Sequence, residues 1–103
     1  MKFIEVASIS EIPVGGAKKV ELEGKEIALF HIQDGVYSAI DDMCQHRGGP
    51  LSEGLVEDKI VSCPWHGWQY DVTSGECLTN SAVCQTKYEV KIEGDKIYIS
   101  IGT

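Results

Sequence analysis

The sequence has no long apolar run, and this absence sets the first limit on what the protein can be. None of its segments approaches the roughly 18 consecutive apolar residues expected of a membrane-spanning helix. Residues 1–10 alternate apolar and polar side chains, whereas a secretory signal peptide contains a continuous apolar segment. We therefore expect a cytoplasmic protein that has no membrane partner.

Positive charge is also scarce. Nine Lys and Arg residues stand against sixteen Asp and Glu residues, so the formal net charge is −7. Nucleic acids and anionic membranes attract basic proteins, so neither is expected as a partner. The negative charge suits a partner with a basic docking patch, although it would equally serve to keep the protein soluble.

Long amphipathic helices, internal repeats and low-complexity segments are absent as well. The chain instead contains short segments in which apolar and polar residues alternate, separated by turn residues such as Glu23-Gly24 and Gly94-Asp95. A short helical turn is expected over residues 8–13 and a surface loop over residues 78–85. These patterns predict one all-β domain over residues 1–103. Strands are predicted over residues 2–6, 18–22, 26–32, 36–40, 55–56, 59–62, 69–72, 87–92 and 96–101.

Cysteine and histidine are few but clustered. The first group is Cys44-Gln45-His46, and the second, sixteen residues later, is Cys63-Pro64-Trp65-His66. Each group offers one thiolate and one imidazole, so together they supply two sulfur and two nitrogen ligands. Tetrahedral zinc uses this set, and so does a [2Fe–2S] cluster in which two histidines replace two cysteines on one iron.

The remaining cysteines and the remaining histidine lie outside these groups. For Cys77 and Cys84 we expect small, buried, inert side chains rather than a disulfide or spare ligands, because disulfides are rare in the cytoplasm. His31 lies in a predicted strand, where a structural role is expected.

The two groups and their flanking residues together resemble the two ligand boxes of the Rieske iron–sulfur family. The first box is represented by residues 44–51, with Gly54 following, and the second by residues 63–71. The matching branch is that of the soluble Rieske-type ferredoxins found in ring-hydroxylating dioxygenase systems. The resemblance implies a Rieske-like antiparallel β-sandwich with a cluster-binding subdomain of two loops at about residues 43–71. It also implies one [2Fe–2S] cluster per chain.

The same resemblance assigns the ligands. Cys44 and Cys63 would hold the iron that lies toward the protein, and His46 and His66 would hold the outer iron. Because neutral imidazoles replace two thiolates, the cluster carries less negative charge and accepts an electron more easily. The outer iron, near the surface, would give a short path to a partner.

Residues around the ligands have expected roles too. Gly48, Gly49 and Gly67 are expected to let the backbone approach the cluster sulfides and to take positive φ angles. Gly54 is expected in an ordinary turn. The prolines would restrict the two loops, the tryptophans would cover the cluster or pack the loops, and by resemblance the tyrosine would donate a hydrogen bond to a cysteine sulfur. These further residues are Pro50, Pro64, Trp65, Trp68 and Tyr70.

Departures from the respiratory branch of the family predict a low reduction potential. Gly49 and Trp65 occupy the positions of the loop disulfide in that branch, and Trp68 replaces a serine that donates a hydrogen bond to a sulfide. With fewer donors near the sulfurs the reduced cluster is less stabilised. We therefore expect a midpoint near the bottom of the Rieske range, at about −150 mV.

The resemblance implies a one-electron carrier that performs no bond chemistry itself. An oxygenase needs a second, mononuclear iron held by two histidines and a carboxylate, and His31 is the one histidine left for it. The expected donor is a flavin-dependent reductase, and the expected acceptor is a terminal oxygenase or a similar oxidoreductase. Arg47, the only arginine, either contacts an acidic group on a partner or is a solvated side chain without a role.

Two alternatives remain at this stage. The chain could be a small electron-transfer subunit of a larger reductase, such as a nitrite-reductase type complex. It could also be a structural zinc-binding domain that uses the same four ligands, although zinc does not require the surrounding glycines and prolines.

Overall fold

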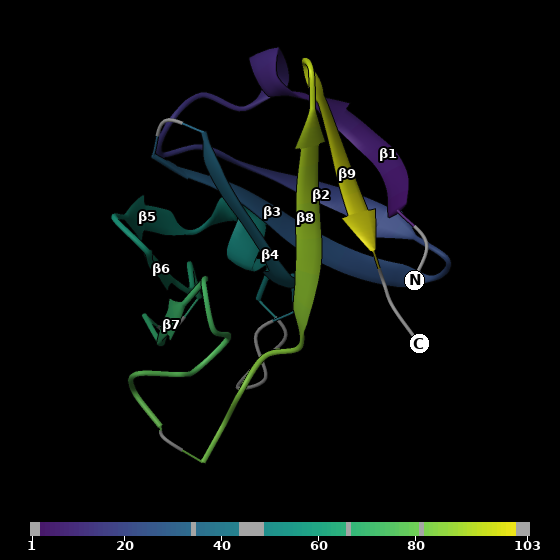
Figure 1. Ribbon diagram of the computed structural model, residues 1–103. Helices are drawn as coiled ribbons and strands as arrows, with labels where there is room; N and C mark the ends of the chain where they lie inside the picture. Colours follow the sequence, from purple (N-terminus) through teal and green to yellow (C-terminus); the bar gives the residue numbers. More distant parts are fainter. Residues whose placement is uncertain (1–2, 34, 44–48, 66, 81, 101–103) are drawn as a thin grey trace.

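The computed structural model describes residues 3–33, 35–43, 49–65, 67–80 and 82–100, and strands dominate this part of the chain (Figure 1). The only helices among these residues are two single 3-10 turns, neither of which has the length and apolarity needed to span a membrane. The elements in chain order are β1 (Phe3–Ser8), η1 (Ile9–Glu11), β2 (Ala17–Leu22), β3 (Lys25–Gln33), β4 (Val36–Asp41), η2 (Leu51–Glu53), β5 (Leu55–Glu57), β6 (Ile60–Ser62), β7 (Gln69–Asp71), β8 (Lys87–Glu93) and β9 (Lys96–Ser100).

The larger sheet has the strand order β1-β9-β8-β4-β3-β2, and its described pairings are antiparallel. The pairing between the two central strands is short, because β4 and β8 pair only at Ala39↔Tyr88 and Ile40↔Lys87. Beyond these pairs the strands separate, so β1, β9 and β8 fold over one face of β2, β3 and β4 as the second layer of a sandwich (Figure 1).

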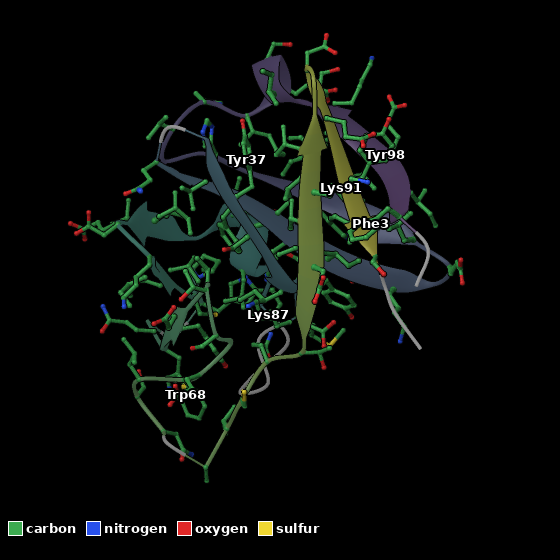
Figure 2. All side chains as sticks on the ribbon, in the orientation of Figure 1. Phe3, Tyr37, Trp68, Lys87, Lys91 and Tyr98 are labelled. Carbon is green, nitrogen blue, oxygen red and sulfur yellow. The ribbon has the colours of Figure 1, made fainter. Side chains whose placement is uncertain are left out.

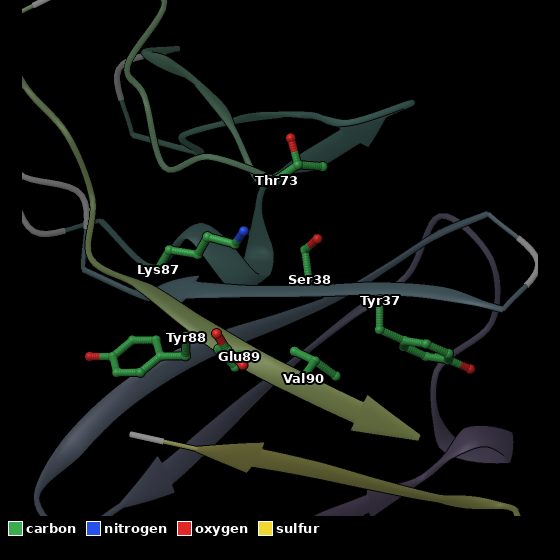
Figure 3. A pocket seen from close by; sticks show the side chains of 7 residues that line it. All are labelled: Tyr37, Ser38, Thr73, Lys87, Tyr88, Glu89 and Val90. Atoms are coloured by element: carbon green, nitrogen blue, oxygen red, sulfur yellow. The ribbon is translucent and has the colours of Figure 1, made fainter. Parts of the chain in front are cut away.

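The separation of β4 and β8 leaves an open cavity of about 260 Å³ between them. Ser38 of β4 and Lys87 of β8 line it, together with Thr73, which comes from the turn after β7 (Figure 3). The cavity therefore lies where the sandwich meets the smaller sheet.

Strand β3 is buried on both faces, and this explains its continuous apolar run. Ile27 and Leu29 contribute to the core between the two layers of the sandwich, whereas Ala28 and Phe30 contribute to a second core on the opposite face. Successive side chains of a strand point to opposite faces, so four consecutive buried residues require a layer on each side. The first core, called the sandwich core here, consists of Ala7, Ile12, Val20, Ile27, Leu29, Ala39, Tyr88, Ile97 and Ile99.

The second core joins the sandwich to the smaller sheet, and we call it the subdomain core. It consists of Ala28, Phe30, Ile40, Leu51, Val61, Cys63, Tyr70, Val72 and Cys77. The smaller sheet has the order β5-β6-β7 and is antiparallel. Cys63 follows β6 directly, so one proposed ligand is attached to this core.

The predicted strands are confirmed, with ends that differ by a few residues. The β5–β6 turn lies at Asp58 and Lys59, one residue later than predicted, and Asp58 takes a φ of 53°. The short helical turn after β1 is confirmed as η1. The turn η2 was not predicted; it packs against β2 and β3 and places Leu51 in the subdomain core.

Replacing Phe30 with alanine tests the two-sided burial of β3. Phe30 is completely buried, so we expect the Phe30→Ala variant to lose roughly 3–5 kcal/mol of unfolding free energy through the cavity that it leaves. Denaturant unfolding measures this loss. The control Val14→Ala changes a side chain that is 58% exposed and should stay within about 0.5 kcal/mol of the wild type. Equal effects of the two substitutions would contradict the packing described here.

Candidate metal centre

The structure describes one of the four predicted ligands. Cys63 lies within the described residues, whereas Cys44, His46 and His66 lie outside them, as do Arg47 and Gly48. No group of three or more His, Cys, Asp or Glu side chains able to hold a metal ion occurs among the residues that are described. The ligand set therefore stays a prediction, and the site is built here from the residues that border it.

Cys63 sits in a tight backbone turn and is 2% exposed. Its N–H donates to the carbonyl of Trp68 at 2.7 Å, and its carbonyl accepts a hydrogen bond from the N–H of Gly67 at 2.9 Å. Gly67 has a φ of +74°, a conformation that residues with a Cβ rarely adopt. The expected positive φ is confirmed for Gly67, and the turn fixes the backbone on both sides of His66.

Gly49 brings the first loop against the second. A Cβ atom built on Gly49 would lie 2.8 Å from the Sγ of Cys63 and 3.1 Å from the indole ring of Trp65. The backbone of the first loop is therefore so close to a cysteine sulfur that no side chain fits between them. The close approach expected of Gly49 is therefore seen toward the Cys63 sulfur, whereas an approach to the cluster sulfides stays a prediction. The expected positive φ was wrong for Gly49, because its need for glycine comes from this close contact and not from a left-handed backbone.

The stems of the first loop are fastened to each other. Met43 and Pro50, which precede and follow residues 44–49 in the chain, form an isolated antiparallel bridge. Asp42 is 2% exposed; its carbonyl accepts from Leu51 N–H at 2.7 Å, and its Oδ1 accepts from Ser52 N–H at 2.7 Å. The carboxylate of Asp42 is thus used to hold the loop stems together rather than being left in solvent.

Gly54 lies after the first loop and packs against the backbone that leads into the second loop. A Cβ atom on Gly54 would lie 2.1 Å from the carbonyl oxygen of Ser62, the residue before Cys63. Its φ is −79°, an angle open to any residue, so the requirement for glycine comes from close backbone contact. The predicted turn is present, since Gly54 N–H donates to Leu51 O at 3.0 Å, but the prediction missed the close contact that requires glycine at this position.

The aromatic residues divide between the core and the surface. Tyr70 is fully buried in the subdomain core with Cys63, and Trp68 is half-buried and packs against the same core (Figure 2). Trp65 is 59% exposed, while its ring borders Gly49. The packing role is confirmed for Trp68, and the hydrogen bond from Tyr70 to a cysteine sulfur stays a prediction.

The structural roles predicted for the remaining histidine and cysteines are confirmed in part. The Nδ1–H of His31 donates to the carbonyl of Ile12 at 2.7 Å, and its ring stacks on Tyr37 at 4.0 Å, so the structural role is confirmed. Cys77 is buried in the subdomain core with a free thiol, so no Cys77–Cys84 disulfide forms. The prediction of burial was wrong for Cys84, which is exposed because its segment runs along the surface.

Two ionisable groups next to the site are perturbed. Burial and the hydrogen bond from the Tyr88 hydroxyl to Asp41 Oδ1, at 2.6 Å, raise the pKa of Tyr88 far above its ordinary value. Burial acts to raise the pKa of Asp71, but hydrogen bonds from Thr73 and the nearby Lys59 ammonium outweigh it and lower that pKa. Tyr88 therefore stays protonated and Asp71 stays ionised at neutral pH.

The fold and these contacts define a small all-β protein in which two glycine-bearing loops close on a buried cysteine. The sequence matches the family of the Rieske [2Fe-2S] domain over residues 2–94. The chain therefore belongs to the Rieske family, whose domain carries one [2Fe–2S] cluster, and it is an electron carrier rather than an enzyme. The zinc-binding alternative is not supported.

Relatives with known roles extend over nearly the whole chain. The ferredoxin component of a naphthalene 1,2-dioxygenase system from Pseudomonas aeruginosa is 36% identical over 97% of this chain and 96% of its own length. The ferredoxin subunit of 3-phenylpropionate/cinnamic acid dioxygenase from Photorhabdus laumondii is 39% identical over 98% of this chain and 96% of its own length.

Solved structures have the same fold. A chain from the complex of reduced oxygenase and oxidized ferredoxin in carbazole 1,9a-dioxygenase is 25% identical, with a TM-score of 0.87 over 95% of this chain and 92% of that one. A Mycobacterium tuberculosis protein assigned as an NADH-dependent nitrite reductase small subunit is 21% identical, with a TM-score of 0.90 over 99% of this chain and 97% of that one. The second likeness shows the fold alone.

A methyl group at Gly49 should weaken the cluster without unfolding the protein. We expect Gly49→Ala to push the first loop away from the Cys63 sulfur and to lower the iron content of the purified protein by at least half, because forcing a methyl group into a filled space costs about 1–3 kcal/mol. Iron and labile-sulfide analysis of the folded protein measures this. Gly35→Ala is the control: its φ of +76° makes it cost about 1 kcal/mol of stability, but no atom lies within 4 Å of its new Cβ. Full iron content in Gly49→Ala would show that the two loops do not need this approach.

Proposed function

We propose that this protein is the cytoplasmic ferredoxin of an oxygenase system, taking one electron at a time from a flavin-dependent reductase and delivering it to a terminal oxygenase. The observation that carries the proposal is the full-length similarity to dioxygenase ferredoxins, together with a chain that has one cysteine sulfur cradled by glycine backbone. Residues 1–103 would act as a single domain, with the cluster region at about 43–71.

The ligands in this proposal are Cys44 and Cys63 on the inner iron and His46 and His66 on the outer iron. The bound cluster supplies a centre that accepts and releases one electron. The chain's own residues hold the frame: Gly49 and Gly67 bring the loop backbone close to Cys63, and Gly54 keeps the two loops together. At Gly49 and Gly54 the contacts leave no space for an added Cβ atom, which at Gly49 would lie 2.8 Å from the Cys63 sulfur.

A partner would dock on the loop tip formed by residues 45–50 and 64–68, because the outer iron lies nearest to it. Among the described residues of this tip, Pro64 and Trp65 are exposed. An exposed indole ring is a common anchor in protein interfaces, since it supplies a large contact area. Long-range attraction would come from the net charge of −7 acting on a basic partner.

A reconstituted system tests the carrier function. The protein purified without oxygen should contain two irons and two labile sulfides per chain, show the rhombic EPR signal of a mixed-ligand cluster when reduced, and titrate at about −150 mV. Added to a reductase and an oxygenase of a dioxygenase system, it should restore product formation. Cys63→Ser should abolish the cluster, whereas Cys84→Ser, at the exposed cysteine, should retain it. Bound zinc without labile sulfide would refute the proposal.

The second candidate function is a small subunit of a nitrite-reductase type complex, and the fold is compatible with it. The two functions differ in their stable partner. A dioxygenase ferredoxin should purify alone and exchange between partners, whereas a reductase subunit should copurify with a large subunit. Copurification in a fixed ratio would favour the second candidate.

Reversing the charge of Arg47 tests its place in docking. If Arg47 contacts an acidic group of the acceptor, Arg47→Glu should slow acceptor reduction several-fold, because a lost or reversed charge pair at an interface costs about 1–3 kcal/mol. The midpoint should hardly move. Stopped-flow kinetics at several salt concentrations measures the rates, and Lys91→Glu on β8, away from the loops, is the control with the same charge change (Figure 2). Identical rates in both variants at every salt concentration would exclude a docking role.

A further inference from the structure

Gln85 is a buried polar residue in a segment that the sequence predicts to be a surface loop. Gln85 is 2% exposed. Its Nε2 donates to two backbone carbonyls, that of Asp41 at 3.0 Å and that of Met43 at 2.7 Å. Carbonyl oxygens only accept hydrogen bonds, so the amide nitrogen must face them, and the orientation of the amide group follows from its partners.

The side chain of Gln85 extends the hydrogen bonding between β4 and β8 beyond the last backbone hydrogen bond of this pair. The β4–β8 ladder runs through Ala39↔Tyr88 and Ile40↔Lys87, and Asp41 N–H then donates to Thr86 O at 2.9 Å. At the next residue the hydrogen bonds come from the side chain instead, and the amide of Gln85 donates to the carbonyls of Asp41 and Met43.

The backbone of Gln85 is held elsewhere, by Gly75. Gln85 N–H donates to the carbonyl of Gly75 at 2.7 Å, and a Cβ atom on Gly75 would lie 2.3 Å from Gln85 O. The backbone N–H of Gln85 is thus used on Gly75, and the side-chain amide is the group of Gln85 that donates to the carbonyls of Asp41 and Met43. Its Oε1 is buried without a hydrogen-bond partner among the described residues, a cost that the two donated bonds must outweigh.

These contacts act on the residue that leads into the first cluster loop. Met43 is bridged to Pro50 and directly precedes Cys44. We propose that Gln85 is a positioning residue for the iron–sulfur cluster: its amide fixes the backbone at Asp41 and Met43 and thereby sets the direction in which Cys44 and His46 are presented. The inference rests on the proposed ligand role of these two residues.

The variant Gln85→Met removes the amide and keeps the length of the side chain. Losing two buried hydrogen bonds should raise the rate of iron release to a chelator by about tenfold or more. The EPR spectrum of the reduced cluster should broaden or shift in g values, and the midpoint should move, because the ligand geometry is less fixed. Gln33→Met, at an exposed glutamine at the end of β3, is the matched control and should leave all three measurements unchanged.

A conservative variant covers the case in which Gln85→Met does not fold. Gln85→Asn keeps an amide but is one methylene shorter, so it should release iron at a rate between those of the wild type and Gln85→Met. Wild-type release and an unchanged EPR spectrum in Gln85→Asn and in any folded Gln85→Met would overturn the proposal. Failure of the proposed function would appear differently, as a wild-type protein without iron and labile sulfide.

Discussion

The burial of β3 on both faces is the constraint on which the rest of the structure depends. Ile27 and Leu29 require a layer on one side, and Ala28 and Phe30 require a layer on the other. The first layer is the sheet formed by β1, β9 and β8, and the second is the small sheet with η2 and the cluster loops. Because both layers are built on the same strand, β3 also fixes where the described stems lie, with Leu51 and Cys63 packed in the same core as Ala28 and Phe30.

Hydrogen bonds and close backbone contacts then fix the segments that lead into the candidate metal centre. The stems of the first loop are fixed by Asp42 and by the Met43–Pro50 bridge, and Gly54 places the same segment against Ser62, just before Cys63. None of these contacts depends on a flexible side chain of the loop tip. Such a preorganised frame would need little rearrangement when a bound cluster gains or loses an electron.

The sequence was sufficient to predict most strands, because alternation and turn residues are local signals. It also predicted a close backbone approach at Gly49 and the positive φ of Gly67, since only glycine lets the backbone come so near to the Cys63 sulfur or turn so sharply beside it. The positive φ predicted for Gly49 is absent. Prediction from the sequence failed for features that depend on contacts between residues far apart in the chain. Gln85 lies in a polar segment without periodicity, and its burial depends on carbonyls more than forty residues away in the chain. The turn η2 follows a proline and is too short for any helical period.

The requirement for glycine at Gly54 was missed for the same reason, because it arises from contact with Ser62 and not from the turn itself. In the same way, nothing in the local sequence distinguishes Cys84, which is exposed, from Cys77, which belongs to the subdomain core. Residues whose role is set by a distant partner are the ones that a single sequence leaves open.

Apart from the carboxylates of Asp41 and Asp42, which accept hydrogen bonds beside the first loop, the charged side chains contribute little to the architecture. Most ion pairs among the described residues, such as Lys19–Glu26 and Lys91–Glu93, lie at the surface with both side chains substantially exposed, and pairs of this kind contribute little to stability. Lys59–Asp71 is the exception, because the Asp71 side chain is only 16% exposed. Stability therefore comes from the two apolar cores and from buried hydrogen bonds. The excess of acidic residues is then free to act at long range, where it changes the rate at which a basic partner is encountered and not the fold. In the proposed function, reduction would add a further negative charge at the loops and so increase attraction to such a partner in the state that has an electron to deliver.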